Sequence, residues 1–297
     1  MKVSGFTIIR NGEKFDYPFI EAILSIAPLC DEIIVAVGNS EDHTRDQVAN
    51  LIERTGHKIK ILDTVWDDSL REGGRVLALE TDKAYAAIDE DNDWCVYIQG
   101  DEVLHEASIP VLHKAMLNEK ENKKTEALLV NYRHFYGSYD YIGDSTRWYR
   151  REIRILRKRD DIFSFKDAQG FRVKTPGGNR KLRAKLTSAF MHHYGWVKDP
   201  RAMQQKQETF NKLWHDDQWM QENIPKADEF DYSKIDSLQK FTGSHPQVMK
   251  DRLARINWQF DHDLSKNTVS IKERIRQFIE RKTGWRVGEY KNYQLVR

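Results

Sequence analysis

The chain has 297 residues, of which 39% are hydrophobic and 11% aromatic, and its formal net charge is +2. This length and apolar content allow a sizeable buried core and exclude wholesale disorder. The 48 basic residues nearly balance the 46 acidic ones. A dedicated nucleic-acid binder usually carries a clear basic excess, so no nucleic-acid partner is expected.

The cysteines and the start of the chain bear on the cellular compartment. Cys30 and Cys95 lie in or beside apolar stretches and form neither a secreted disulfide pattern nor a CxxC metal site, so we expect reduced, buried thiols. Residues 1–5 lead into a strand-like segment that does not resemble a signal peptide. No apolar run approaches the roughly 20 residues that cross a bilayer. These features predict a cytoplasmic protein with at most peripheral contact at the inner membrane face.

Strand-like and helix-like patterns alternate in the first part of the chain. Continuous apolar runs such as residues 32–37 are typical of strands buried on both faces of a parallel sheet, and the segments between them have helical periodicity. In chain order we predict strand 3–9, helix 17–27, strand 32–37, helix 44–56, strand 58–62, helix 74–88 and strand 94–98. This order predicts an α/β fold with a mostly parallel sheet flanked by helices.

Polar loops follow the carboxyl ends of the predicted strands, which is where ligands bind in parallel sheets. These loops cover residues 10–11, 38–44, 67–75 and 99–106. Their clustering is the first indication of a functional site.

The pattern changes after residue 126. We predict antiparallel additions to the sheet at 127–135, 152–157 and 181–194, followed by helices at 201–220, 246–258 and 271–282. The chain therefore divides into a core of residues 1–198 and a helical C-terminal extension of residues 199–297 that packs on the core.

The strand at 94–98 ends in Gln99-Gly100-Asp101-Glu102. Two adjacent carboxylates at the ligand-binding edge suit Mg²⁺ or Mn²⁺, because such a cation takes one or two carboxylates and fills its other positions with phosphate oxygens and water. A solvated turn with two ordinary acids is the alternative.

The first half of the chain resembles family 2 glycosyltransferases, the inverting enzymes of the GT-A fold. Ser40, Asp42 and Thr44 match the Gly-Ser-x-Asp-Gly-Thr loop that follows the second strand of that family. Residues 6–11 resemble its first strand and nucleotide-contacting loop, and residues 71–75 its glycine-containing loop before the metal strand. Gly100-Asp101-Glu102 stands in the place of its Asp-x-Asp metal motif.

The sequence departs from this family at two places. Val37 or Gly38 stands where an acidic residue usually ends the second strand, and Gln99 replaces the first Asp of the metal motif. Asp101 is then the principal metal ligand, and Glu102 is left to hold a water or a sugar hydroxyl. The donor-binding residues that the resemblance implies are Arg10, Asn11, Ser40, Asp42, Arg71, Gly74, Gln99 and Gly100.

The resemblance implies a GT-A, Rossmann-like fold and an enzyme that moves a sugar from a nucleotide-diphosphate donor to a hydroxyl acceptor with inversion. It implies Mg²⁺ or Mn²⁺ as cofactor. The implied acceptor is a surface glycan or a lipid-linked intermediate, as in bacterial polysaccharide or lipopolysaccharide assembly.

His193, in the sequence Met191-His192-His193-Tyr194-Gly195, is the second metal-ligand candidate. In related transferases a strand that ends in His-Tyr-Gly brings its His to the metal and diphosphate, and His193 is the matching position. His192 faces the other side of the strand, so at most one of the two serves. Phosphate contacts from the following segment are expected from Lys198, Arg201 or Lys206. A histidine pair without a ligand is the alternative.

Asp167 is the candidate general base for the acceptor hydroxyl, with Asp140 and Asp144 as rivals. Asp167 precedes the strand that leads to His193, where similar transferases place a carboxylate base. An ordinary loop acid is the alternative interpretation.

Two further segments allow more than one interpretation. The aromatic-rich stretch 132–149 can shape an acceptor site, although core packing is favoured. The basic amphipathic helix 271–282 can lie on an anionic membrane, but packing on its own domain or on a second copy in a homodimer is favoured.

Two other functions remain open. A nucleotidyltransferase also uses such a sheet and a carboxylate-bound metal, although residues 5–11 lack its glycine-rich phosphate loop. A non-catalytic sugar-binding or assembly subunit would keep the fold, and the missing first Asp of the metal motif favours it.

Overall fold

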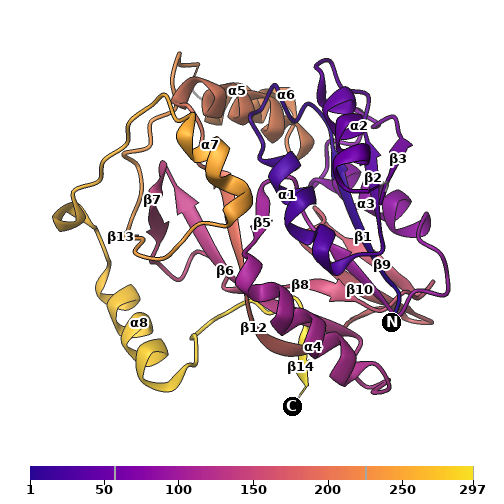
Figure 1. Ribbon diagram of the computed structural model, residues 1–297. Coiled ribbons are helices and arrows are strands. Elements are labelled where there is room, and N and C mark those ends of the chain that lie inside the picture. Colours follow the sequence, from indigo (N-terminus) through magenta and orange to yellow (C-terminus); the bar gives the residue numbers. More distant parts are fainter. Residues whose placement is uncertain (57, 225, 297) are drawn as a thin grey trace.

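Four parallel strands form the centre of the sheet. The computed structural model describes residues 1–56, 58–224 and 226–296. The strands β1 (Val3–Ile9), β2 (Glu32–Val37), β3 (Ile59–Asp63) and β4 (Trp94–Tyr97) lie in the order β4-β1-β2-β3. Three of them, β1, β2 and β3, are labelled in Figure 1. Every neighbouring pair in this row is parallel, so the carboxyl ends of all four strands meet at one edge.

Alternate residues of each central strand face opposite layers of the fold. One layer consists of α1 (Phe19–Ile26), α2 (Thr44–Arg54) and α4 (Ile109–Glu119), and the other contains α3 (Arg75–Ala86). On β2, Ile33 and Val35 join the first core, while Ile34 and Ala36 join the second. A strand buried on both faces explains the continuous apolar run in the sequence.

The second half of the sheet is mixed. Its strands are β5 (Glu102–Leu104), β6 (Ala127–Tyr136), β7 (Ser138–Gly143), β8 (Arg151–Leu156), β12 (Arg183–Trp196), β13 (Leu238–Lys240) and β14 (Gln294–Val296). The full order is β13-β7-β6-β8-β4-β1-β2-β3, and β12 lies beside β6 and pairs also with β5 and β14. The predicted α/β fold with antiparallel additions is confirmed.

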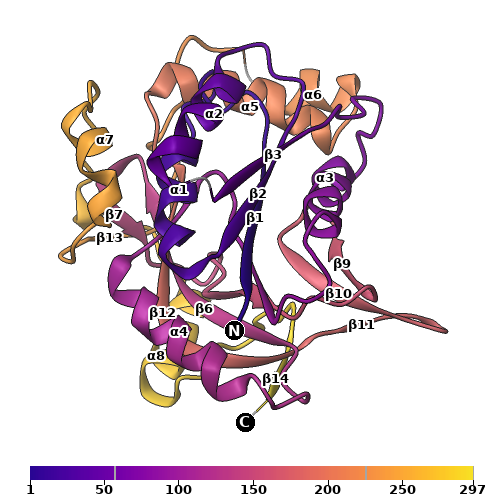
Figure 2. The same ribbon diagram turned by 45° about the vertical axis from the view of Figure 1, so that its right-hand side comes forward.

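A separate three-stranded antiparallel sheet covers the α3 side of the molecule (Figure 2). It consists of β9 (Ile162–Phe165), β10 (Gly170–Thr175) and β11 (Gly178–Lys181). Phe171 and Val173 of β10 pack in the same core as Tyr85 of α3. The loop between β9 and β10, which contains Asp167, is therefore anchored beside the central sheet.

The last part of the chain is less helical than predicted. Its helices are α5 (Pro200–Phe210), α6 (Asp217–Asn223), α7 (Lys250–Ala254) and α8 (Ile271–Thr283). The predicted helix 201–220 is wrong as one element, because the Asp216 side chain accepts a hydrogen bond from the Trp219 backbone N–H and starts a new helix. The predicted helix 246–258 shrinks to the five residues of α7. β13 and β14 return this segment to the sheet, and the domain boundary near residue 198 stays a prediction.

Both cysteines are free and buried, as expected, and burial raises the pKa of each thiol. In the described part of the chain, no helix combines the length and the apolar content that a bilayer-spanning segment needs.

A buried ion pair links β8 to the turn that follows β4. The Arg154 guanidinium donates two hydrogen bonds to the Glu102 carboxylate, at 2.7 and 2.8 Å, and both side chains are at most 1% exposed. Tyr132 donates a third hydrogen bond to Glu102, at 2.7 Å. Arg154 also donates to the Gln169 carbonyl at 3.0 Å. One guanidinium therefore holds both the 99–102 turn and the β9–β10 loop.

Replacing Arg154 with alanine leaves the Glu102 charge buried without its cation. We expect the Arg154→Ala variant to lose about 3–5 kcal/mol in free energy of unfolding, measured by urea denaturation. Arg45→Ala is the matched control, because Arg45 makes a similar two-bond pair with Asp63 at the surface. Solvent screens that exposed pair, so its loss should change the stability little. Equal losses in the two variants would contradict this account.

Candidate active site

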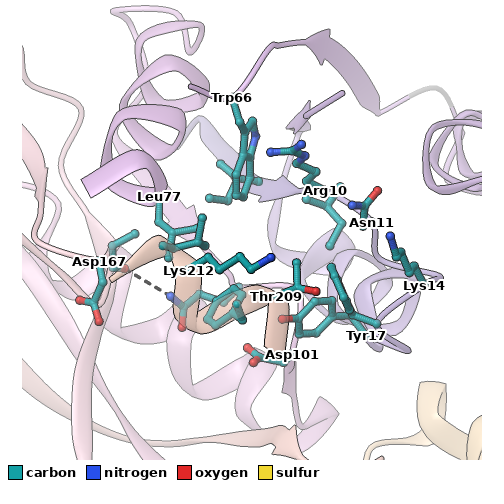
Figure 3. A pocket seen from close by; sticks show the side chains of 18 of the residues that line it. Arg10, Asn11, Lys14, Tyr17, Trp66, Leu77, Asp101, Asp167, Thr209 and Lys212 are labelled. Carbon is teal, nitrogen blue, oxygen red and sulfur yellow. Dashed lines mark hydrogen bonds between the residues drawn. The ribbon is translucent and has the colours of Figure 1, made fainter. Parts of the chain in front are cut away.

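A cavity of about 450 Å³ opens at the carboxyl edge of the parallel strands (Figure 3). This volume lies in the range of small-molecule sites in proteins. Its walls come from the ends of β1 and β4, the loop after β3, the β9–β10 loop and the segment 209–214. The predicted site residues that line it are Arg10, Asn11, Arg71, Gln99, Gly100, Asp101 and Asp167. Five segments that are far apart in sequence thus meet at one cavity.

A flat aromatic and cationic wall forms one end of the cavity. The guanidinium carbon of Arg10 lies 5.7 Å from the centre of the Trp66 ring (Figure 3). Arg10 is also ion-paired with Asp68. Gly38 permits this arrangement, since a Cβ there would lie 2.5 Å from Trp66 Nε1. The Trp66 Nε1 is buried and has no hydrogen-bond partner among the residues that the structure describes. This wall offers a stacking surface and polar groups to a planar ligand such as a base.

The predicted donor residues Ser40 and Asp42 lie behind the cavity wall. The Ser40 hydroxyl accepts from the Asn11 backbone N–H at 3.0 Å, and the Asp42 carboxylate accepts from the Lys14 N–H at 2.8 Å. Asn11 has a φ of 54° and accepts from the Glu41 N–H at 2.8 Å. Ser40 and Asp42 therefore fix the shape of the loop that carries Arg10, Asn11 and Lys14, and neither lines the cavity.

Asp101 and His193 face each other at the cavity edge. His193 Nε2 lies 3.6 Å from Asp101 Oδ2. Gly195 makes room for the pair, because a Cβ at that position would lie 2.6 Å from the Asp101 carboxylate. Burial opposes ionisation of Asp101, but His193, Lys206 and Lys198 outweigh burial and hold the pKa of this carboxyl below its usual value. Asp101 is therefore an anion beside an imidazole.

The hydrogen bonds of His134 determine which ring nitrogen of His193 is free. His134 Nε2 lies 2.6 Å from the Tyr149 carbonyl, which can only accept, so this nitrogen carries a proton. Burial lowers the pKa of His134 well below its usual value, so the ring is neutral and its Nδ1 is an acceptor. The His193 Nδ1 lies 3.2 Å from it and must donate. Burial lowers the pKa of His193 and Asp101 raises it, with burial the larger effect, and in the neutral ring it is the Nε2 lone pair that faces Asp101.

When the His193 ring is neutral, its lone pair and the Asp101 carboxylate face each other at 3.6 Å, and either a proton on Nε2 or a cation between the two groups removes their repulsion. The donor set fits a divalent metal whose remaining ligands come from phosphate and water. It does not fit a site in which the protein supplies all the ligands, because no group of three His, Cys, Asp or Glu residues in the described ranges is arranged to hold a metal. Asp101 and His193 are the residues that would hold the ion, with His134 orienting the imidazole.

Two buried lysines lie near Asp101. Lys206 Nζ lies 3.9 Å from Asp101 Oδ2 and donates to the Gly195 carbonyl at 2.9 Å. Lys198 Nζ donates to the Asp16 carbonyl at 2.8 Å, and both ammonium groups lie within 5.0 Å of the Tyr17 ring centre. Burial lowers the pKa of both lysines. An anionic ligand beside Asp101 would offset the cost of burying this positive charge.

Asp167 lies at the opposite end of the cavity from Arg10 (Figure 3). It stands between Lys166 and Ala168, which have φ values of 56° and 62°, in a tight and strained turn. The Gln99 side chain donates to the Ala168 carbonyl at 3.4 Å. A Cβ at Gly74 would lie 2.7 Å from the Asp167 Cβ, so Gly74 acts by allowing this close approach.

Several predicted site residues make structural contacts instead. Glu102 is fully buried on Arg154 and lies outside the cavity lining. Arg71 donates to the carbonyls of Lys212 and His215, at 2.9 and 3.1 Å, and so ties the 67–75 loop to the segment 211–215. Asp144 lies beside α8, where its carbonyl accepts from Gln277 at 2.8 Å. The rivals of Asp167 for the base, Asp140 and Asp144, are thus absent from the cavity lining.

The sequence did not single out every residue of the cavity. Trp66, Asp68 and Tyr17 line it, as do Lys212 and Trp214. Trp66 and Asp68 lie in or beside the polar loop predicted after the third strand, so a tryptophan in such a loop was an available signal. The contribution of Lys212 and Trp214 depends on tertiary packing across 140 residues and had no local signal. The aromatic stretch 132–149 packs largely in the core, with Tyr132, Phe135, Tyr136, Tyr139 and Tyr141 buried.

Comparison of the chain with models of known protein families finds no match, and comparison with curated proteins finds none either. Among solved structures, the chain is similar to residues 1–349 of S. aureus TarS in complex with UDP, with 12% identity and a TM-score of 0.41. That match covers 77% of this chain and 68% of the other. A structure of S. aureus TarS that is covered to only 38% gives 13% identity and a TM-score of 0.42 over 70% of this chain.

The chain is also similar to glucosyl-3-phosphoglycerate synthase from Mycobacterium tuberculosis in complex with Mn²⁺, UDP and glucosyl-3-phosphoglycerate. The identity is 22% and the TM-score 0.29, over 46% of this chain and 45% of the other. The chain therefore spans less than half of that enzyme. At these identities the likeness concerns the fold, and the function rests on the geometry of the site.

Proposed function

We propose that the protein is a glycosyltransferase that moves a sugar from a nucleoside-diphosphate donor to a hydroxyl acceptor, with inversion at the anomeric carbon. The observation that carries this proposal is the placement of Asp101 opposite His193 Nε2, at 3.6 Å, at the edge of the cavity. Such a pair suits a divalent cation, Mg²⁺ or Mn²⁺, that is shared with a diphosphate.

The groups along the cavity match the parts of such a donor in order. The Trp66 and Arg10 wall suits the nucleoside. Asp101, His193 and Lys206 lie together and suit the diphosphate and its cation. Asp167, at the far end, is then beside the sugar and the acceptor.

The reaction is a single displacement. The acceptor oxygen forms a bond to the anomeric carbon as the bond from that carbon to the diphosphate oxygen breaks, and the acceptor proton passes to the Asp167 carboxylate. The bonding electrons leave with the diphosphate, whose growing charge is stabilised by Lys206. A bound divalent cation would supply further neutralisation of the leaving group.

A non-catalytic sugar-binding subunit is the second candidate. The subunit is favoured by Gln99, which replaces the first carboxylate of the metal motif and whose side chain holds two neighbouring segments together. That side chain donates to Ala168 O and accepts from Arg154. This subunit would bind the donor without turning it over. The proposed acceptor is a surface glycan or a lipid-linked intermediate, as the sequence resemblance implies.

Replacing Asp101 with alanine removes the only carboxylate of the paired site. We expect donor turnover to fall by about a hundredfold or more, to the level that a chelator gives with the unchanged protein. The measurement is release of nucleoside diphosphate from UDP- and GDP-sugars with Mn²⁺. Asp140→Ala, an exposed acid outside the cavity, is the control. Full turnover by Asp101→Ala would remove the metal assignment.

Replacing Asp167 with asparagine keeps the shape of the side chain and removes the base. We expect transfer to fall by about 10²–10⁴-fold while donor affinity, measured by calorimetry, stays unchanged. Loss of donor affinity together with turnover would instead assign Asp167 to donor binding. Donor binding by the unchanged protein with no turnover would favour the subunit.

A further inference from the structure

The helix α8 lies on the outer side of the mixed half of the sheet, away from β3 (Figure 1). It is attached through its polar side. Glu273 accepts from the Thr146 hydroxyl at 2.6 Å, and Gln277 donates to the Asp144 carbonyl at 2.8 Å. Glu280 binds Arg150 at 3.0 Å and Arg286 at 2.7 Å. The sequence favoured packing on the domain or on a second copy, and the contacts that α8 makes with residues 144–150 come from its polar face.

The apolar side of α8 consequently faces outward. Ile271, Ile275 and Phe278 follow each other at helical spacing and are 79%, 55% and 63% exposed. Trp285, just beyond the helix, is 58% exposed. A surface helix of a globular domain normally turns its apolar stripe toward the core. This reversed attachment leaves a contiguous apolar surface without cover, which marks an interaction site.

The charges on the outward side of α8 are all positive. Lys272, Arg274 and Lys282 are exposed, and Arg281 is exposed at 3.9 Å from Asp144. The two acids of the helix, Glu273 and Glu280, are both used in the attachment and are only 15% and 20% exposed. The surface that is presented is therefore apolar along its centre and basic along its edges.

The helix is also complete before it meets a partner. The Ser270 hydroxyl accepts from the Glu273 N–H at 3.2 Å and caps the start. Gly284, with a φ of 70°, ends the helix in the left-handed conformation. No ordering of the backbone is needed for docking, so the apolar area is available for binding.

We propose that the outward face of α8 binds the surface of an anionic phospholipid bilayer. Apolar side chains flanked by cations match both parts of such a surface, the acyl boundary and the negative headgroups. Trp285 suits the headgroup level, where tryptophan is enriched in membrane proteins. A purely apolar partner would offer no anionic group to the exposed cations Lys272, Arg274 and Lys282. This proposal does not depend on the activity of the cavity.

Co-sedimentation with phospholipid vesicles tests the proposal on the full-length protein. We expect binding to vesicles that contain phosphatidylglycerol and little binding to vesicles of phosphatidylcholine alone, with the difference lost in high salt. Replacing Ile275 and Phe278 with serine should weaken binding about tenfold for each side chain. The double variant Lys272→Glu, Lys282→Glu should weaken it about fivefold for each charge that is removed.

The matched control is Leu117→Ser on α4, which removes a comparably exposed apolar side chain at a different surface and should bind like the unchanged protein. All these positions are exposed, so the variants should keep the fold, which circular dichroism checks. Equal sedimentation with both vesicle types, or no sedimentation with either, would overturn the proposal. So would a dimer in solution that the Ile275 and Phe278 substitutions separate, because the face would then be a contact between two copies.

Discussion

The geometry of the candidate site depends on the buried ion pair between Glu102 and Arg154. Both side chains lie in the core and are at most 1% exposed. Each also makes hydrogen bonds to other groups, Glu102 with Tyr132 and Arg154 with the Gln169 carbonyl. Removing either partner would leave an unpaired charge, so the pair fixes one arrangement of the chain around it. Glu102 also accepts from the Gln99 backbone N–H at 3.2 Å, which closes the turn that carries Asp101. Glu102, which resembles a metal ligand in the sequence, thus supports the turn of its neighbour Asp101.

The Arg154 guanidinium also links the turn that carries Asp101 to the loop that carries Asp167. It contacts the turn of Asp101 through Gln99 and the loop of Asp167 through the Gln169 carbonyl. On the other side of Asp101, His134 fixes the tautomer of His193. Supporting groups of this kind orient reactive side chains that contact the ligand directly. The cavity is therefore built at the ends of paired strands, and left-handed backbone conformations occur in the turn around Asp167 and at Asn11.

The central strands could be predicted because a short, continuous apolar run such as Glu32–Val37 is typical of a strand that is buried on both faces. Asp101, His193 and Asp167 were found through resemblance and order along the chain, and whether they act as assigned stays a prediction. The role of Glu102 could not be predicted, since a second acid after a strand looks the same whether it faces a ligand or a buried arginine. Trp66 and Lys212 join the cavity through tertiary packing. The orientation of α8 could not be predicted, because periodicity shows that a helix has two faces and not which one is attached.

The central claim is that Asp101 and His193 share a divalent cation with the donor diphosphate. Pulsed electron paramagnetic resonance of Mn²⁺ bound together with UDP tests it most directly, because it detects an imidazole nitrogen on the metal. This account predicts a nitrogen coupling in the unchanged protein that disappears in His193→Ala. The coupling should weaken in a His134→Ala variant, in which the His193 ring is no longer held by His134. Mn²⁺ bound with UDP but without any imidazole nitrogen, or UDP binding that needs no metal, would contradict it.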